Sequence, residues 1–153
     1  MTARRSRHAA HGHAPLQLEQ FLPYRLSILS NTLSQAIARD YQQRFSLSMT
    51  EWRVMAVLGR FDALSAREVA ERTAMDKVAV SRALARLVAA GRVSRTIHDG
   101  DKRRSVLRLT AAGWTIHDTV APLAREHERE VLALLDADER AVLARILDKL
   151  APV

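Results

Sequence analysis

The sequence of 153 residues contains no cysteine. This absence excludes a disulfide framework, a thiolate nucleophile, a cysteine redox sensor and a zinc site built on cysteine ligands. Charged residues interrupt every apolar stretch, so no segment reaches the roughly 20 apolar residues that a membrane-spanning helix needs. No apolar segment of signal-peptide length follows the basic stretch 1–15. We therefore expect a soluble protein of the reducing cytoplasm.

The sequence also lacks the usual signatures of an enzyme. It has no Gly-rich phosphate loop, no metal-ligand spacing and no nucleophile with a suitable base. The only dense group of titratable residues comprises Glu126, His127, Glu128 and Glu130. Helical spacing places these four on different sides of one helix, which is typical of a solvated face. We expect no catalytic activity, no cofactor and no metal site.

Length and composition predict one domain, because 48% hydrophobic residues suffice for one sizeable core. Residues 1–15 show no apolar period and are predicted to form a disordered basic arm before a single domain at 16–153. The arm holds three histidines, His8, His11 and His13, which we interpret as a polar run rather than a metal site.

The net charge of +7 is concentrated in the centre of the chain. Residues 67–108 carry eleven basic and five acidic residues, whereas residues 109–153 carry five basic and eight acidic ones. A concentrated basic stretch is the electrostatic mark of a surface that meets phosphates. The alternative is an ordinary solvated basic face.

Apolar spacing and capping residues predict three helices in the first half of the chain. The first covers about 16–45 with an apolar stripe of Leu22, Leu26, Leu29, Leu33 and Ile37. Capping-box pairs, Ser48 with Glu51 and Ser65 with Glu68, predict the starts of a helix at 50–60 and of a short helix ending near Arg72.

A fourth helix is predicted from the N-cap Asp76 to about Ala90, where Gly91 supplies a left-handed stop. Its predicted buried stripe consists of Val80, Leu84, Leu87 and Val88. The other face carries the residues that suit a helix entering the DNA major groove: Lys77, Val78, Ser81, Arg82 and Arg86. The alternative is that these are ordinary solvent-facing side chains.

Two β-prone runs at 93–98 and 105–109, joined by a turn at 99–102, predict a hairpin directly after that helix. Its tip carries Asp101, Lys102, Arg103 and Arg104. An arginine there can enter a narrow minor groove while Asp101 holds its guanidinium in place. The alternative is a weak surface ion pair. A helix-turn-helix followed at once by a basic hairpin predicts a winged helix that binds DNA.

The end of the chain predicts two more helices. Thr110 caps the first, which we expect to bend or restart at Pro122 and to continue to Leu135. Asp136 or Asp138 opens the second, whose apolar stripe runs from Val142 to Leu150. This stripe and that of 16–45 exceed what a winged-helix module can cover, so we expect a homodimer. The alternative is that both helices complete a monomer core.

Residues 47–113 resemble the multiple-antibiotic-resistance regulator (MarR) family. The matching segments are Leu-Ser-Met-Thr-Glu-Trp-Arg-Val at 47–54, Met-Asp-Lys at 75–77 leading to Val-Ser-Arg at 80–82, residues 87–95, Asp-Lys-Arg at 101–103, and Leu-Thr-Ala-Ala-Gly at 109–113. The flanking helices match only in length and pattern. The resemblance implies a mainly α fold with a β-hairpin wing, a lobe at 46–113 that binds DNA, and dimerisation helices at 16–45 and 114–153.

By this resemblance Ser81 and Arg82 lie in the recognition helix, and Asp101 and Arg103 form the wing-tip pair. The family pattern varies at Arg104. The resemblance also implies a small aromatic or phenolic effector, for which Trp52, Met55 and His117 are the candidate pocket residues, although Trp and Met on an apolar stripe also fit a plain core.

The predicted function is therefore a homodimeric repressor that binds a palindromic operator and is released by an effector. The alternative is an architectural protein that binds DNA without sequence preference.

Overall fold

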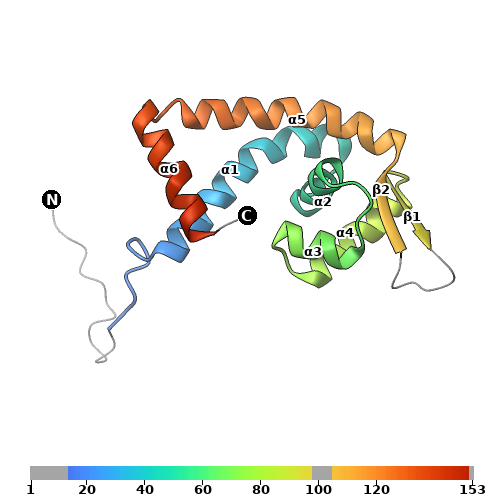
Figure 1. The fold of residues 1–153 in the computed structure, drawn as a ribbon, viewed down its shortest axis with the longest axis horizontal. Coiled ribbons are helices and arrows are strands. Elements are labelled where there is room, and N and C mark those ends of the chain that lie inside the picture. The colour runs from blue at the N-terminus through green and yellow to red at the C-terminus, as the bar shows by residue number, and fades with distance from the viewer. Residues whose placement is uncertain (1–13, 98–104, 152–153) are drawn as a thin grey trace. The chain divides into compact units, whose positions relative to one another are not determined.

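The computed structural model describes residues 14–97 and 105–151. These residues form six helices and one two-stranded antiparallel sheet (Figure 1). In chain order the elements are α1 (Leu22–Phe45), α2 (Met49–Arg60), α3 (Ala66–Thr73), α4 (Lys77–Ala89), β1 (Val93–Ile97), β2 (Ser105–Leu109), α5 (Ala111–Leu132) and α6 (Ala137–Leu150). The predicted class, mainly helical with a hairpin wing, is confirmed.

The chain divides into two compact units, Met1–Ser34 and Gln35–Val153, and the boundary falls inside α1. Over the described ranges, every helix is too short or too polar to cross a membrane.

In the first unit, α1 begins at Leu22 and not at Leu16 as the sequence predicts. The residues before it form a turn in which the backbone N–H of Phe21 donates to the carbonyl of Leu18 at 3.1 Å. Pro23 explains the late start, because its ring would clash with the carbonyl four residues earlier in a longer helix. At the first turn a proline is tolerated, since the missing N–H has no helical partner there.

In the second unit, the predicted capping boxes are both present. Ser48 and Glu51 cap the N-terminus of α2, and Ser65 and Glu68 cap the N-terminus of α3. Each pair satisfies two backbone N–H groups that would otherwise lack a partner, so both helix starts are fixed by local sequence.

Helix α4 packs a stripe of small and branched residues inward: Val80, Ala83, Leu84 and Leu87 are all buried. The prediction that Val88 completes this stripe is wrong, because its side chain is 36% exposed. At 100° per residue, Ala83 lies one turn before Leu87 on the inner face, whereas Val88 is rotated toward the edge of the stripe.

The hairpin is antiparallel, with Val93 opposite Leu109 and Ile97 opposite Ser105. Its second strand is also held from the other side, because the N–H of Leu107 donates to the carbonyl of Leu64 at 2.8 Å. The wing strands are therefore joined to the loop between α2 and α3 and do not stand free.

One hydrophobic core joins the last turns of α1, the helices α2, α3 and α4, the hairpin and the first half of α5. Its fully enclosed side chains are Tyr41, Leu47, Met55, Leu58, Leu84, Leu87, Leu107, Val54, Val69, Val80, Val93 and Val120. The residues that enclose this core also orient α4, so the core fixes which face of α4 is turned outward.

The last two helices differ in burial, because α5 buries Ile116 and Val120 whereas α6 leaves its apolar side exposed. Helix α5 is continuous through Pro122 and ends at Leu132, so the predicted bend or restart does not divide it, and its end comes before Leu135. Asp136 caps α6 through a capping box with Glu139. Helix α6 has no buried residue, although Ile146 and Leu147 lie on its apolar side.

Candidate nucleic-acid interface

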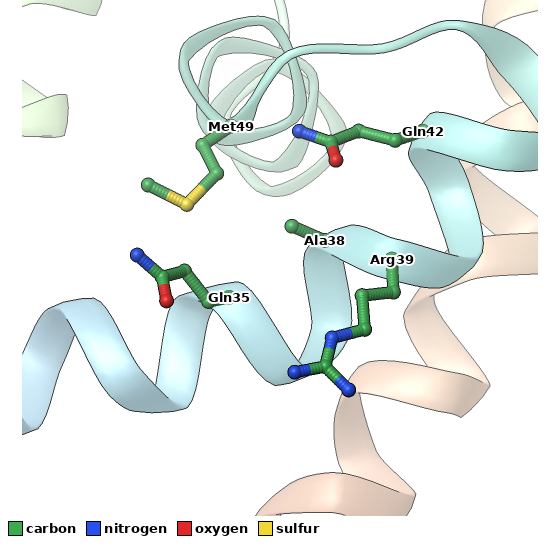
Figure 2. Close-up of a pocket in the computed structure, with 5 residues that line it drawn as sticks. All are labelled: Gln35, Ala38, Arg39, Gln42 and Met49. Carbon is green, nitrogen blue, oxygen red and sulfur yellow. The ribbon is translucent and has the colours of Figure 1, made fainter.

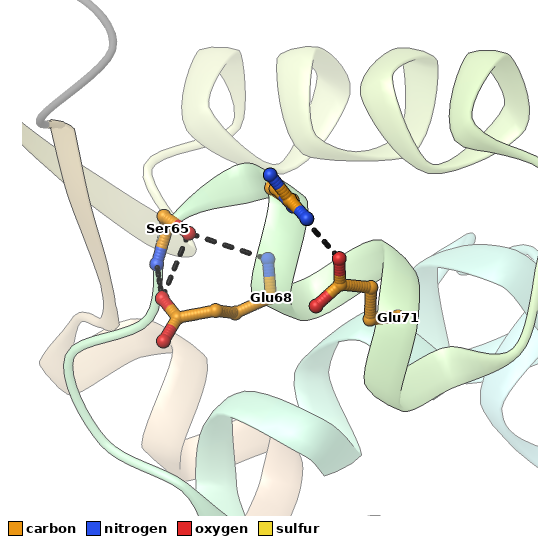
Figure 3. Close-up of polar contacts among 4 residues, drawn as sticks. Ser65, Glu68 and Glu71 are labelled. Atoms are coloured by element: carbon orange, nitrogen blue, oxygen red, sulfur yellow. Dashed lines mark hydrogen bonds and ion pairs between the residues drawn. The ribbon is translucent and has the colours of Figure 1, made fainter.

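Helix α3 and the turn after it set the start of α4. Ser65 Oγ accepts a hydrogen bond from the backbone N–H of Glu68, and the Glu68 carboxylate accepts bonds from the N–H and hydroxyl of Ser65 at 2.8 and 2.7 Å (Figure 3). These bonds from the Ser65 backbone and side chain lower the pKa of Glu68. Ala74, the C-cap residue of α3, has the left-handed conformation, with φ of 51°. The carboxylate of Asp76 then accepts the N–H of Ala79 at 2.9 Å and begins α4.

The outward face of α4 carries all five predicted recognition residues. Lys77, Val78, Ser81, Arg82 and Arg86 are all exposed, and Val78 is 55% exposed. The opposite face is anchored in the core, so the backbone that carries these side chains is fixed. The face combines cations, a hydroxyl and an aliphatic group, which suits contacts to phosphates, base edges and a thymine methyl.

A hollow of about 300 Å³ lies between α3 and α4, lined by Ala66, Arg67, Ala70, Lys77, Val80, Ser81 and Leu84. Lys77 and Ser81 therefore belong both to the outward face and to this hollow. Arg67 is paired with Glu71 at 2.8 Å, and both side chains are exposed. Part of the positive charge on α3 is thus compensated, whereas no ion pair of Arg82 or Arg86 occurs in the described part of the chain.

The strands of the wing are in place, but its predicted tip residues Asp101, Lys102, Arg103 and Arg104 lie outside the described residues. On β2, the Arg108 guanidinium contacts the Asp62 carboxylate at 3.3 Å. This contact adds to the bond between Leu107 and Leu64 and ties the wing strands to the loop before α3.

Two of the three predicted effector residues lie together. The rings of Trp52 and His117 are 6.0 Å apart between centroids, and His117 also meets the edge of Trp114 at 5.1 Å. Tyr41 adjoins Trp52 at 5.8 Å, and burial raises the pKa of Tyr41 to about 12. The aromatic cluster of Tyr41, Trp52, Trp114 and His117 thus joins α1, α2 and α5.

The close packing of this aromatic cluster is visible at Gly59. A Cβ atom added there would come within 2.6 Å of the His117 ring, so His117 fills the space above the glycine. The third predicted effector residue, Met55, is fully buried in the core.

A second hollow, of about 440 Å³, was not predicted from the sequence (Figure 2). Its lining comes from α1 and the first residue of α2: Gln35, Ala38, Arg39, Gln42 and Met49. Figure 2 shows the amides of Gln35 and Gln42 and the thioether of Met49 around the same space. The available signal was the spacing of Gln35, Arg39 and Gln42 at i, i+4 and i+7, which places these three polar residues on one side of the helix.

The titratable residues on α5 form ordinary surface pairs. His127 lies 3.6 Å from Asp40 and 3.4 Å from Glu130, and Arg129 pairs with Glu126. Within the ranges 14–97 and 105–151, no group of three His, Asp or Glu side chains is arranged to hold a metal ion. The three histidines of the predicted arm lie outside these ranges.

Comparison with known proteins finds similarity to one family of transcriptional regulators. A model of the MarR family matches residues 45–104. The HTH-type transcriptional regulator BilQ of Clostridium symbiosum is 26% identical over 133 residues, which cover 87% of this chain and 92% of BilQ.

Three solved structures share the fold. A MarR/EmrR family transcriptional regulator from Acinetobacter sp. ADP1 has 27% identity and a TM-score of 0.78, with 88% of this chain and 95% of that chain covered. A mutant MarR from Escherichia coli complexed with operator DNA has 26% identity and a TM-score of 0.74, with 91% and 100% covered. The PcaV regulator from Streptomyces coelicolor, in complex with its natural ligand, has 26% identity and a TM-score of 0.69, with 91% and 97% covered. The recognition-helix geometry, the hairpin and these matches together show that the chain is similar to the MarR family of winged helix-turn-helix transcriptional regulators.

Proposed function

We propose that the protein is a homodimeric repressor that binds a palindromic DNA operator in a sequence-specific manner and releases it on binding a small effector. The observation that carries this proposal is the outward face of α4, where Val78, Ser81, Arg82 and Arg86 project from a helix whose other face is anchored in the core. The similarity to a regulator solved with operator DNA supports the same role for this face.

Each residue on this face has a chemical role in the proposal. Arg82 reads a base edge, because a guanidinium can donate two parallel hydrogen bonds to guanine. Ser81 donates to or accepts from a base, and Val78 contacts a thymine methyl. Lys77 and Arg86 neutralise phosphates and so set the register of the helix on the duplex.

The wing tip completes the contact in this proposal. Arg103 enters the minor groove next to the recognition helix, and Asp101 orients its guanidinium. Lys102 and Arg104 add contacts to phosphates. The anchoring of β2 by Leu64 and Asp62 supports the proposal, because it fixes the strands from which the tip extends.

The uncovered apolar residues of the terminal helices support the proposed dimer. On α6, Ile146, Leu147 and Leu150 are 48%, 49% and 61% exposed, and on α1 Leu22 and Leu29 are 51% and 53% exposed. Covering such residues is favourable by about 25 cal/mol for each Å² of apolar surface removed from water. We infer that helices within 16–45 and 114–153 pair with a second copy, while 46–113 forms the lobe that binds DNA. A two-fold dimer places its recognition helices about 34 to 36 Å apart and selects an inverted repeat.

We propose that the effector is a small aromatic or phenolic acid bound where α1 and α5 meet the lobe. Trp52 and His117 lie next to each other there, with ring centroids 6.0 Å apart, and Met55 is buried in the adjoining core. The hollow at the junction of α1 and α2 is lined by the guanidinium of Arg39 and the amides of Gln35 and Gln42. These groups can donate hydrogen bonds to the carboxylate of such an acid. The ligand-bound PcaV structure supports a ligand-responsive role.

This role requires no enzyme active site, and we place the protein in the cytoplasm, where the DNA is. The alternative is an architectural protein that binds phosphates alone. Selection of bound fragments from genomic DNA by the purified protein at near-physiological salt separates the two. The repressor requires enrichment of a short inverted repeat, whereas uniform recovery of all sequences would establish the architectural role and contradict the proposal.

A further inference from the structure

Arg92 lies at a junction of four elements. It follows Gly91, between the end of α4 and the start of β1, and its side chain is partly buried. Its guanidinium Nη2 donates a hydrogen bond of 2.6 Å to the carbonyl of Phe45, the last residue of α1 and 47 positions earlier in the chain. This bond joins the end of α1 directly to the end of the recognition helix.

The partner of Arg92 suits a cation. The last carbonyl groups of a helix have no helical N–H partner and carry partial negative charge. A guanidinium is always charged in proteins, and hydrogen bonds from charged donors are shorter and stronger than neutral ones. The Phe45 carbonyl is therefore a favourable acceptor for Arg92.

The backbone of Arg92 is fixed as firmly as its side chain. Its N–H donates to the Leu87 carbonyl at 2.9 Å, and the N–H of Gly91 donates to Val88 at 3.0 Å, which is a Schellman closure of α4. Gly91 has the positive φ, 68°, that this closure requires. The end of α4 thus has a single conformation, and Arg92 is part of it.

The carbonyl of Arg92 connects the same point to α5. It accepts a hydrogen bond from the N–H of Thr110 at 3.1 Å, and Thr110 in turn caps α5. A Cβ atom added at Gly113 would collide with this carbonyl, so only glycine allows the close approach. One residue therefore holds together α1, α4, the base of the wing and α5.

We propose that Arg92 is a positioning residue for DNA binding: it fixes the recognition helix and the wing relative to the last turn of α1 without touching DNA. The inference rests on the proposed DNA-binding role of α4. In this proposal, a displacement of the last turn of α1 also moves the DNA-binding face, because the hydrogen bond between Arg92 and the Phe45 carbonyl joins the two.

The salt dependence of DNA affinity tests the proposal, because a positioning residue and a phosphate contact differ in their effect on it. Losing a phosphate contact lowers the slope of log affinity against log salt by about one, whereas losing a positioning contact leaves the slope unchanged. The probe is the DNA fragment that the wild type binds most tightly. Four variants are compared with wild type at several salt concentrations: Arg92→Ala, Arg92→Lys, Arg86→Ala and the matched charge control Arg125→Ala.

The expected result for Arg92→Ala is an affinity about tenfold lower at an unchanged salt slope, the loss typical of one charge-assisted hydrogen bond. Arg92→Lys keeps a charged donor and should recover most of the affinity. Arg86→Ala should give a shallower slope, and Arg125→Ala, an exposed residue on α5, should change neither quantity. If Arg92→Ala does not fold, Arg92→Met, which keeps the aliphatic stem and removes every donor, replaces it.

Two results would overturn the proposal. A shallower slope in Arg92→Ala, like that of Arg86→Ala, would mean that Arg92 contacts phosphate, and an unchanged affinity would mean that the junction does not matter for binding. Hydrogen exchange of the segment 40–48 gives a readout that does not need DNA. It should be faster in Arg92→Ala and slow again in Arg92→Lys. If the wild type binds no DNA, the proposed function fails, and unchanged exchange in this segment would separately refute the role of Arg92.

Discussion

Replacing Arg82 by alanine should lower affinity for the operator and also relax the preference for one base pair. Arg82 is exposed on the outer face of α4, and no ion pair within the described residues uses its side chain. Its removal should therefore change the free energy of unfolding by less than about 0.5 kcal/mol. A bidentate contact to a guanine contributes about 1 to 3 kcal/mol of discrimination, which corresponds to about 5- to 150-fold in affinity.

The assay is competition binding with a set of operators that differ at one base pair at a time. Wild type should discriminate at each contacted position, and Arg82→Ala should lose discrimination at one position of each half-site while keeping it at the others. Thermal unfolding of the variant checks that the fold is intact, and Arg125→Ala controls for the loss of one positive charge. An equal loss of affinity on every sequence would refute the base-reading role and reduce Arg82 to a phosphate contact.

Three further predictions concern the wing, the dimer and the start of α3. Arg103→Ala should weaken binding and make its salt dependence shallower, because a charge contact to DNA is lost; an unchanged slope in a salt titration would count against it. Ile146→Asp places a charge on the exposed apolar side of α6 and should produce monomers in analytical ultracentrifugation, whereas an intact dimer would exclude this helix from the interface. The hydrogen bonds from Ser65 lower the pKa of Glu68 in the folded state, so their stabilisation is complete above the ordinary glutamate pKa and is lost as pH falls through the lower folded value. Ser65→Ala should reduce this acid-side loss in pH-dependent denaturation, and an identical pH profile would contradict the assigned cause.

The features that the sequence predicted correctly depend on neighbouring residues. The capping boxes at Ser48 and Ser65 and the N-cap Asp76 are visible in the sequence, because cap and partner lie three residues apart. The outward face of α4 also followed from its helical period. Val88 shows the limit of this reasoning. The helical period places both Ala83 and Val88 beside the buried residues Val80, Leu84 and Leu87, and only packing against the core decides that Ala83 is buried and Val88 is exposed.

The features that were missed depend on contacts between distant segments. Nothing around Arg92 in the sequence points to the carbonyl of Phe45, because a backbone acceptor has no sequence signature. The hollow beside Arg39 forms only when α1 meets the start of α2. The need for glycine at position 113 also comes from a distant contact. The carbonyl of Arg92 occupies the space that a side chain at this position would need.

Binding of a dimer to an inverted repeat can be tested by a hydroxyl-radical footprint of the purified protein on the genomic fragment that it binds most tightly, combined with the stoichiometry of the complex. A dimeric repressor should give two protected regions related by two-fold symmetry, centred about one helical turn apart, and two protein chains for each site. Uniform protection along the fragment, or one protein chain on one unrepeated site, would contradict a dimer that reads an inverted repeat with two copies of α4.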